Sequence, residues 1–379
     1  MRVIDLTDPD NASRVAMITR YPPSESGSAL SALDLARQLA LRHGFAIEVI
    51  RLVLPGEPAA EGHPVVMDVN AQWHMCPRLA ARRANRCDIA VLRLDRHVPI
   101  EFIEELLLEL EVPVVLAVDE LGPAETDASL AGLVNIADNI VAPSETSRRR
   151  LSAMARDSIA IEVIPPGSPW RPLEPTDRIR RRILTWGYLA PGMGAERVIR
   201  SLARLRDLGP KPRYRLIGVT DPAWTRGEGD AYRAQLAIEA EKLGVRRQLD
   251  IVPILHSRRA LEREIEKCDV IAVAYDSRDR ASSRILAEAV STGRPVVATA
   301  FPGATEILSS GAGAAVDHGD IDAMAGALRT YLTDDEEYMR AARAGAAMST
   351  SLSMDETARK YASLLGRRLG EHPLTVNKA

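Results

Sequence analysis

Short apolar runs alternate with amphipathic stretches through the first half of the chain. The run RVAMITR (14–20) leads into a loop. The next stretch, SALSALDLARQLALRHG (28–44), has apolar residues at helical spacing and ends at Gly44, which is typical of a helix C-cap. Further strand-like runs follow at 46–54, 87–94, 113–118 and 161–167. Three segments between these runs have a helical pattern: 102–110, a stretch that ends with the residues 136–144, and 145–155. Ser144 is a candidate N-cap for the last of them.

A Pro-rich stretch, 165–180, interrupts this alternation and is typical of a linker, with five prolines and several charges. The alternation then restarts. Strand-like runs are expected at 182–189, 213–219, 248–254, 269–275 and 295–300, and helices at 194–209, 231–244, 257–268, 283–293, 321–332 and in an Ala-rich tail to about residue 369.

The two halves predict an α/β protein with two Rossmann-like domains, each built on a parallel sheet, facing a cleft. The expected bounds are 1–168 for the first domain and 176–355 for the second. A final helix, 356–379, is expected to pack back toward the first domain. Because parallel sheets bind ligands at the carboxyl ends of their strands, the cleft between the sheets is the expected site.

Composition and charge narrow the range of possible functions. The chain has 379 residues, 46% of them hydrophobic, and its net charge of −3 argues against bulk nucleic-acid binding. No apolar run approaches the ~18 residues of a membrane span, and the start MRVIDLTDPD lacks an export-signal pattern, so a cytoplasmic protein is expected. Basic runs such as 148–150, 178–182 and 258–259 are either solvated helix faces or patches for an anion or a membrane surface.

Metal and cofactor motifs are not evident. Three scattered cysteines and the spacing of His74, His97 and His256 do not suit a metal site, so none is expected. Neither a dinucleotide-binding glycine motif nor a P-loop is present, so no resident cofactor is expected either. The oligomeric state is not predicted.

The most informative segment is 274–308, AYDSRDRASSRILAEAVSTGRPVVATAFPGATEIL. A strand ends near Tyr275, and a polar loop runs into the start of a helix, where free backbone N–H groups favour an anion. Ser282 and Ser283 stand at that start, able either to cap the helix or to contact a phosphate. Glu288 follows about one and a half turns into the helix.

This segment resembles the nucleotide-binding signature of family-4 glycosyltransferases with the GT-B fold. Glu288 falls on the second of the family's two glutamates, which holds the nucleotide ribose hydroxyls. The remaining signature positions also fall in place: Gly293, Pro295, Val296, Val297, Gly303 and Glu306. Glu306 could alternatively favour its helix start by its charge. The likeness extends to RVAMITRYPPSESG, which carries Gly27 in the first loop, and to ILTWGYLAPGMGAERVI, whose Gly187 opens the expected phosphate loop of the second domain.

Several positions depart from that family pattern. Arg280 stands where the first glutamate is expected, and Met193 where the family has a phosphate-clamping lysine. The arginine that often accompanies the lysine falls near Leu189, and a histidine after the strand 113–118 is replaced by Asp119. Arg280 and Arg284 could supply the missing positive charge, since a guanidinium grips phosphate oxygens and stays charged, or they could face solvent.

The resemblance implies transfer of a sugar from a nucleotide-diphosphate sugar to an acceptor hydroxyl, without a metal and with retention of configuration. Asp119 and Arg280 are the catalytic candidates, and Asp119 could be a base, a sugar ligand or a turn cap. The donor-binding candidates are Gly27, Gly187, Ile254, Ser282, Ser283, Arg284 and Glu288. The acceptor is left open among a glycan, a lipid and a small molecule. The alternative is a catalytically degenerate GT-B binding or regulatory subunit that partners another transferase.

Overall fold

The computed structural model describes residues 12–24, 27–54, 66–70, 76–95, 97–119, 121, 127–174, 180–221, 226–253 and 257–371. The chain divides into two compact units. Unit 1 comprises Met1–Gly167 and Met354–Ala379, and unit 2 comprises Ser168–Ser353. The first boundary lies within the Pro-rich stretch expected to be a linker, and the second immediately precedes the last helix.

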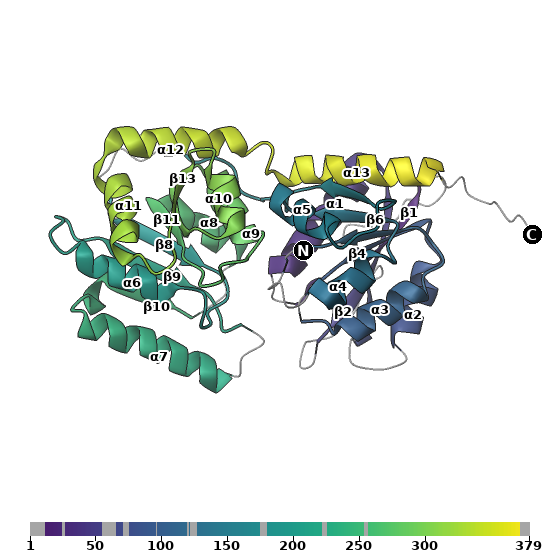
Figure 1. The fold of residues 1–379 in the computed structure, drawn as a ribbon, viewed down its shortest axis with the longest axis horizontal. Coiled ribbons are helices and arrows are strands. Elements are labelled where there is room, and N and C mark those ends of the chain that lie inside the picture. Colours follow the sequence, from purple (N-terminus) through teal and green to yellow (C-terminus); the bar gives the residue numbers. More distant parts are fainter. Residues whose placement is uncertain are drawn as a thin grey trace, which may run out of the picture. The chain divides into compact units, whose positions relative to one another are not determined.

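Unit 1, in which Figure 1 labels the strands β1, β2, β4 and β6, is built on a parallel sheet. Its strand order is β3-β2-β1-β4-β5-β6-β7. The chain moves outward from β1 in one direction and returns to β4 on its other side, so the strand order reverses between β1 and β4. The strands are β1 Arg14–Thr19, β2 Ala46–Val53, β3 Val66–Asn70, β4 Ile89–Arg93, β5 Val114–Ala117, β6 Asn139–Ala142 and β7 Ala160–Val163.

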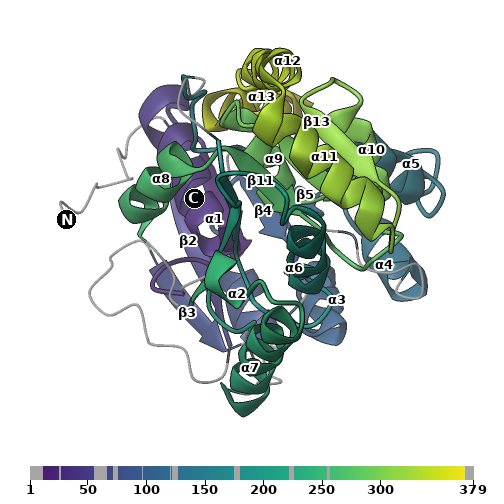
Figure 2. The same ribbon diagram turned by 90° about the vertical axis from the view of Figure 1, so that its left-hand side faces the viewer.

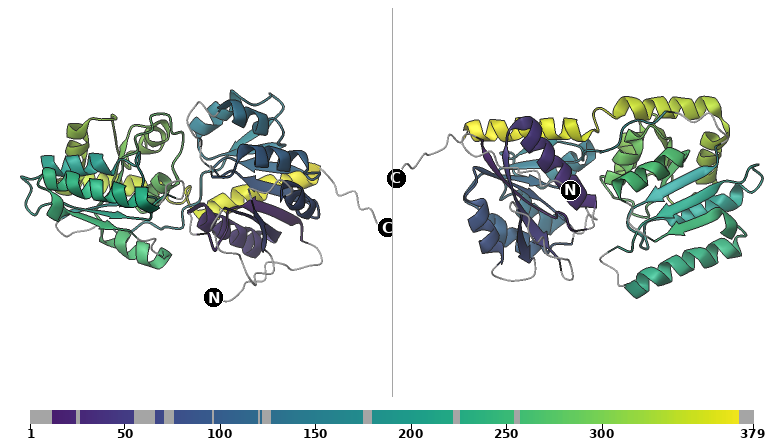
Figure 3. Two further views of the ribbon diagram at one scale, coloured as in Figure 1. Left: turned by 90° about the horizontal axis from the view of Figure 1, so that it is seen from below. Right: turned by 180° about the vertical axis from the view of Figure 1, so that it is seen from behind.

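Helices cover this sheet because its strands are apolar on both sides. One face packs against α1 and α13, which also contact each other (Figure 3), and their buried leucines, alanines and Tyr361 meet Val15, Met17 and Val49. The last helix therefore completes the core of unit 1. The unit's helices are α1 Gly27–His43, α2 Cys76–Ala84, α3 Ile100–Leu108, α4 Asp127–Val134, α5 Glu145–Ser152 and α13 Met354–Glu371.

The structure of unit 1 departs from the sequence prediction in some elements and agrees with it in others. Strand β3 and helix α2 were not predicted. The stretch expected to be helical up to 136–144 divides into α4 and the buried strand β6. Ser144 caps α5 as predicted, because its side chain accepts a hydrogen bond from the Ser147 amide.

Unit 2 repeats the architecture with the strand order β10-β9-β8-β11-β12-β13, again all parallel. The order reverses between β8 and β11. The strands are β8 Arg182–Trp186, β9 Arg213–Ile217, β10 Leu249–Val252, β11 Val270–Val273, β12 Val296–Thr299 and β13 Gly313–Val316. Two parallel α/β sheets, the predicted fold class, are thereby confirmed.

Two helical layers enclose the sheet of unit 2. Helices α6, α7, α11 and α12 pack on the face that carries Ile183, Tyr214 and Leu216, and α6 lies beside α11 (Figure 2). Helices α8, α9 and α10 pack on the face that carries Leu184 and Trp186. The helices are α6 Ala195–Arg204, α7 Arg226–Lys242, α8 Arg258–Lys267, α9 Arg284–Ser291, α10 Pro302–Leu308, α11 Ile321–Thr333 and α12 Asp335–Met348. Within the described residues, no helix has the length and apolarity needed to cross a bilayer.

Candidate functional site

The reversal of strand order in unit 2 places two loops side by side at the carboxyl edge of the sheet. One loop, residues 187–194, follows β8, and the other, residues 274–283, follows β11. In open parallel sheets ligands bind at this kind of point, because the two loops diverge and leave a crevice between them. The sequence-predicted donor residues Gly187, Ser282 and Ser283 all lie in these two loops.

Glycine shapes the first loop. Gly194 has φ +75° and is the N-cap of α6, and a Cβ there would lie 1.5 Å from the carbonyl oxygen of Ala274. Gly187, at φ +122°, donates its amide to the Ile217 carbonyl. The Asp276 amide donates to the Gly192 carbonyl at 2.9 Å, so the loop after β8 is fixed directly onto the loop after β11. This close backbone contact explains why a glycine is needed at 194.

The second loop leads into α9, which begins at Arg284. Ser283 is its N-cap: the Ser283 Oγ accepts a hydrogen bond from the Leu286 amide at 3.2 Å and contacts the Tyr275 hydroxyl at 3.4 Å. The structure therefore shows the capping role that the sequence left open beside phosphate contact. Gly303 lies so close to this loop that a Cβ would be 2.6 Å from the Ala281 carbonyl oxygen. Glu306 is the fifth residue of α10, beyond the first turn, so it does not charge-stabilise that helix start.

Glu288 points inward from α9 and is 4% exposed. Its Oε2 accepts a long hydrogen bond, 3.4 Å, from the Trp186 indole Nε1, and its Oε1 pairs with the Arg284 guanidinium one turn earlier. Trp186 is the last residue of β8, directly before Gly187. The carboxylate is thus held at the point where the strand order of unit 2 reverses.

The two candidate arginines occupy different settings. The Arg280 guanidinium lies 4.3 Å from the centre of the Tyr275 ring, an aromatic contact that fixes its position. Arg284 pairs with Glu288 through Nη1, and its side chain remains 30% exposed. Both arginines therefore lie at the carboxyl edge of unit 2. Neither the contact of Arg280 with Tyr275 nor that of Glu288 with Trp186 was predicted from the sequence.

Acidic groups at this edge are also partnered. Asp276, just after β11, pairs with Arg197 of α6 at 2.6 Å. Burial is the main reason why the pKa of Glu196 in the first turn of α6 is raised. Met193, which stands where the resemblance expects a lysine, packs against the apolar cluster of α9 and α10. The positive charge at this edge comes from α6, α9 and the loop before α9 instead.

In unit 1 the corresponding edge holds Asp119, just beyond β5. Its Oδ2 accepts two hydrogen bonds from Arg93, at 2.9 Å from Nε and 2.6 Å from Nη2. Burial acts to lower the pKa of Arg93, but the charge and hydrogen bonds of Asp119 outweigh it, and the pKa is raised. Arg93 is 4% exposed and its Nη2 also donates to Ser31 of α1 at 3.3 Å. Arg93 was not singled out in the sequence, where it appears only as an ordinary arginine within an apolar run.

The structure describes few contacts of the remaining candidate residues or does not describe them. Gly27 is the first residue of α1, and the next residue, Ser28, donates a hydrogen bond to Asp95 at 3.0 Å. Asp95 lies after β4, so the start of α1 is tied to the edge of the sheet. Ile254 lies outside the described residues, as do His74 and His256. Within the described part of the chain, no group of three or more His, Cys, Asp or Glu side chains is arranged to hold a metal ion.

Solved structures of known proteins match the whole architecture. HepE of Anabaena, solved in complex with UDP, superposes with a TM-score of 0.75 at 17% identity, covering 93% of this chain and 100% of that one. Sucrose-phosphate synthase from Thermosynechococcus elongatus gives a TM-score of 0.74 at 15% identity, covering 95% and 100%. The protein therefore has the GT-B fold.

Sequence comparison matches part of the chain to a known family. Residues 172–348 match the family model described as "Glycosyl transferases group 1". A D-inositol 3-phosphate glycosyltransferase of Nocardioides sp. is 28% identical over 257 residues, which are 63% of this chain and 56% of that protein. The chain spans about half the length of the curated relatives it matches. Unit 2 is thus similar over nearly its whole length to group 1 glycosyl transferases, which confirms the resemblance seen in the sequence.

Proposed function

We propose that this protein transfers a glycosyl group from a nucleotide-diphosphate sugar to an acceptor hydroxyl, without a metal ion and with retention of anomeric configuration. The observation that carries the proposal is the buried Glu288 carboxylate at the point where the strand order of unit 2 reverses. In this reaction the bond from the anomeric carbon to the diphosphate breaks, a bond to the acceptor oxygen forms, and the acceptor hydroxyl loses its proton.

Glu288 has the capacity to bind a ribose. A carboxylate offers about four acceptor positions, and the protein uses one on each oxygen, through Trp186 and Arg284. Burial of a carboxylate with incomplete hydrogen bonding is costly, so a ligand that adds two hydroxyl donors is favoured there. The 2′ and 3′ hydroxyls of a ribose are such a pair.

The arginines suit the other end of the donor. A leaving nucleoside diphosphate gains negative charge, and preorganised cations at that position stabilise it. Arg284 is anchored by Glu288, and Arg280 by the Tyr275 ring, so neither needs to reorganise when charge develops. We infer that these two guanidinium groups take the place of the family's lysine, which is Met193 here, and that Ser282, Ser283 and Gly187 border the phosphates.

Acceptor contacts would come from unit 1, and Asp119 is the candidate group there. Two hydrogen bonds from Arg93 hold its carboxylate in one orientation. A carboxylate held in this way can accept a hydrogen bond from a sugar hydroxyl. Gly27, at the start of α1, is a candidate for backbone contact with the donor, and Ile254 for contact with the base.

The second candidate function is a GT-B subunit that binds but does not catalyse. The observation that favours it is that both candidate carboxylates are paired with arginines of the protein: Asp119 with Arg93, and Glu288 with Arg284. Such a protein would bind a nucleotide and partner an active transferase.

A turnover assay separates the two functions. The protein is incubated with UDP-, GDP- and ADP-sugars, with and without acceptors, and released nucleotide is measured. UDP is included because HepE was solved with it, and D-inositol 3-phosphate because a relative bears that name. We expect release with at least one donor, and a loss of about ten- to 100-fold in kcat/KM for Glu288→Gln, the range for a lost charged hydrogen bond.

The matched control is Glu266→Gln, an exposed glutamate on α8 that should leave release unchanged. Nucleotide binding that depends on Glu288 without release from any donor would favour the binding subunit. Equal release by wild type and Glu288→Gln would refute the assigned role of Glu288.

A further inference from the structure

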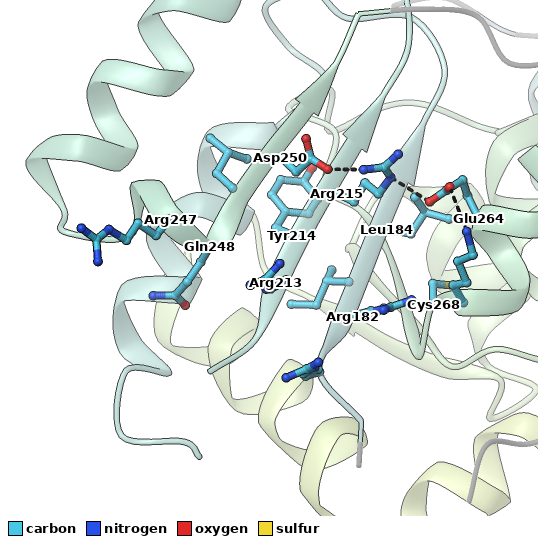
Figure 4. A pocket seen from close by; sticks show the side chains of 14 residues that line it. Arg182, Leu184, Arg213, Tyr214, Arg215, Arg247, Gln248, Asp250, Glu264 and Cys268 are labelled. Atoms are coloured by element: carbon cyan, nitrogen blue, oxygen red, sulfur yellow. Dashed lines mark hydrogen bonds and ion pairs between the residues drawn. The ribbon is translucent and has the colours of Figure 1, made fainter. Parts of the chain in front are cut away.

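A cavity of about 370 Å³ lies in unit 2 at the opposite edge of the sheet from the proposed donor site. Its floor is the amino-terminal ends of β8, β9 and β10, and α8 forms one wall (Figure 4). That volume lies within the range of small-molecule sites, which run from roughly 300 to 1,000 Å³. The cavity therefore has room for a ligand, and nothing in the group 1 transferase chemistry proposed above makes use of it.

The alternation of side chains along the strands explains why this cavity is polar. Arg182, Arg213, Arg215 and Asp250 occupy positions on the same sheet face as Leu184, which belongs to the apolar cluster under α8, α9 and α10. At the carboxyl ends of the strands that face is apolar and covered by these helices, but at the amino ends arginines take the apolar positions. An arginine so placed can lay its methylene stem along neighbouring apolar side chains while its guanidinium group stays in water.

The charge of the lining is strongly positive. Five arginines and one lysine line the cavity, against two carboxylates, Asp250 and Glu264. Both carboxylates are already engaged: Arg215 lies between them, pairing with Asp250 and, at 2.7 Å, with Glu264, which also pairs with Lys267 at 3.6 Å (Figure 4). A further carboxylate behind the cavity, Asp269, accepts hydrogen bonds from the amides of residues 181 and 182.

Four arginines remain without a carboxylate partner among the described residues: Arg181, Arg182, Arg213 and Arg247. All four side chains are exposed and come from three neighbouring strands or the turns before them. Several like charges held around one concavity repel one another unless an anion lies between them, and such a concavity concentrates anions. Guanidinium groups also match the geometry of phosphate oxygens.

We propose that this cavity is a second ligand site, distinct from the donor site, which binds a compound that carries phosphate groups with at least two negative charges. Arg182 and Arg213, on the adjacent strands β8 and β9, are its principal phosphate contacts, and Arg181 and Arg247 complete its rim. The phosphate is either that of a free small molecule or that of a lipid headgroup at a membrane surface. In both cases arginine guanidinium groups would bind the phosphate oxygens.

The test compares two double variants of equal charge. Arg182→Gln/Arg213→Gln removes two cations from the cavity. Arg263→Gln/Arg343→Gln removes two exposed arginines from α8 and α12 that do not line it. Inorganic pyrophosphate is titrated calorimetrically into each protein in an Arg284→Gln background, which weakens the donor site. Co-sedimentation with vesicles of phosphatidylglycerol and phosphatidylcholine, against phosphatidylcholine alone, forms the second arm.

We expect pyrophosphate binding to weaken at least ten-fold in the cavity variant and less than two-fold in the control, since each charged hydrogen bond contributes about one order of magnitude. If vesicle binding is also weakened in the cavity variant but not in the control, and if pyrophosphate displaces the vesicles, the phosphate is that of a lipid headgroup. The proposal is overturned if neither probe binds, or if both double variants lose binding equally. Because the readout is binding in the Arg284→Gln background, it does not depend on whether the protein is a transferase.

Discussion

Gly194 is the position where one added methyl group most directly perturbs the proposed donor loop. At φ +75°, alanine costs about 1–2 kcal/mol in backbone strain. Its Cβ would also lie 1.5 Å from the Ala274 carbonyl oxygen, so the loop must move by about 1.5 Å to restore a 3.0 Å contact. Overpacking of this kind adds about 1–3 kcal/mol.

Gly192→Ala is the matched control, because Gly192 has φ +89° but no atom within 4 Å of an added Cβ. Gly192→Ala should therefore incur only the cost of backbone strain. For a unit of this size each kcal/mol lowers Tm by about 2–4 °C, so Gly194→Ala should unfold about 2–12 °C below Gly192→Ala in a calorimetric scan. Nucleotide affinity of the folded Gly194→Ala protein should also fall, since the loop is displaced from β11. Equal Tm values for the two variants would refute the packing of residues 187–194 against β11.

Three further predictions concern local contacts. Burial acts to raise the pKa of Asp95, but hydrogen bonds from His97 outweigh it and lower the pKa from 3.8 to about 2. The resulting stability is present above pH 4 and lost toward pH 2, so Asp95→Asn should reduce the free energy of unfolding by about 2 kcal/mol at pH 7 and converge with wild type near pH 2 in urea titrations. Ser283→Ala should cost about 1 kcal/mol through loss of the α9 cap, and Ser283→Thr should restore most of it; identical urea midpoints would contradict the cap. Arg93→Leu should cost about 2–3 kcal/mol by removing both Arg93 hydrogen bonds to the Asp119 carboxylate, less than a fully buried pair because Asp119 is 27% exposed, and adding Asp119→Asn should recover part of the loss.

The sequence predicted the two α/β domains because nearly every buried strand is a short apolar run flanked by a helical pattern. It failed for β3 and α2 in unit 1 and for α10 and β13 in unit 2. The strand β3 has the mixed sequence VMDVN, and α2 begins with Cys76-Pro77 and carries three arginines within nine residues, so neither has a clear period. These elements are defined by pairing with β2 and by packing on α3, which are tertiary effects.

The candidate site was predictable from the sequence only where it depends on residues that are close together along the chain. The cap at Ser283 and the position of Glu288 follow from neighbouring residues. The Trp186 contact to Glu288 joins residues 102 apart, and the Arg93 contact to Asp119 joins residues 26 apart. Both depend on which strands are neighbours in the sheet, which the hydrophobic pattern does not reveal. The arginine-lined cavity requires the same knowledge, since its cations come from β8, β9, the turn before β10 and α8, which are separate in sequence.

The proposed contact between Glu288 and a ribose is tested most directly by comparing a nucleotide with its dideoxy form in two proteins. UDP, GDP and ADP, and the 2′,3′-dideoxy form of whichever binds, are titrated into wild type and Glu288→Gln. We predict that wild type prefers the ribose form about ten-fold or more, and that Glu288→Gln reduces this preference to about two-fold or less. An equal preference in both proteins would contradict the assignment of Glu288 as the ribose ligand.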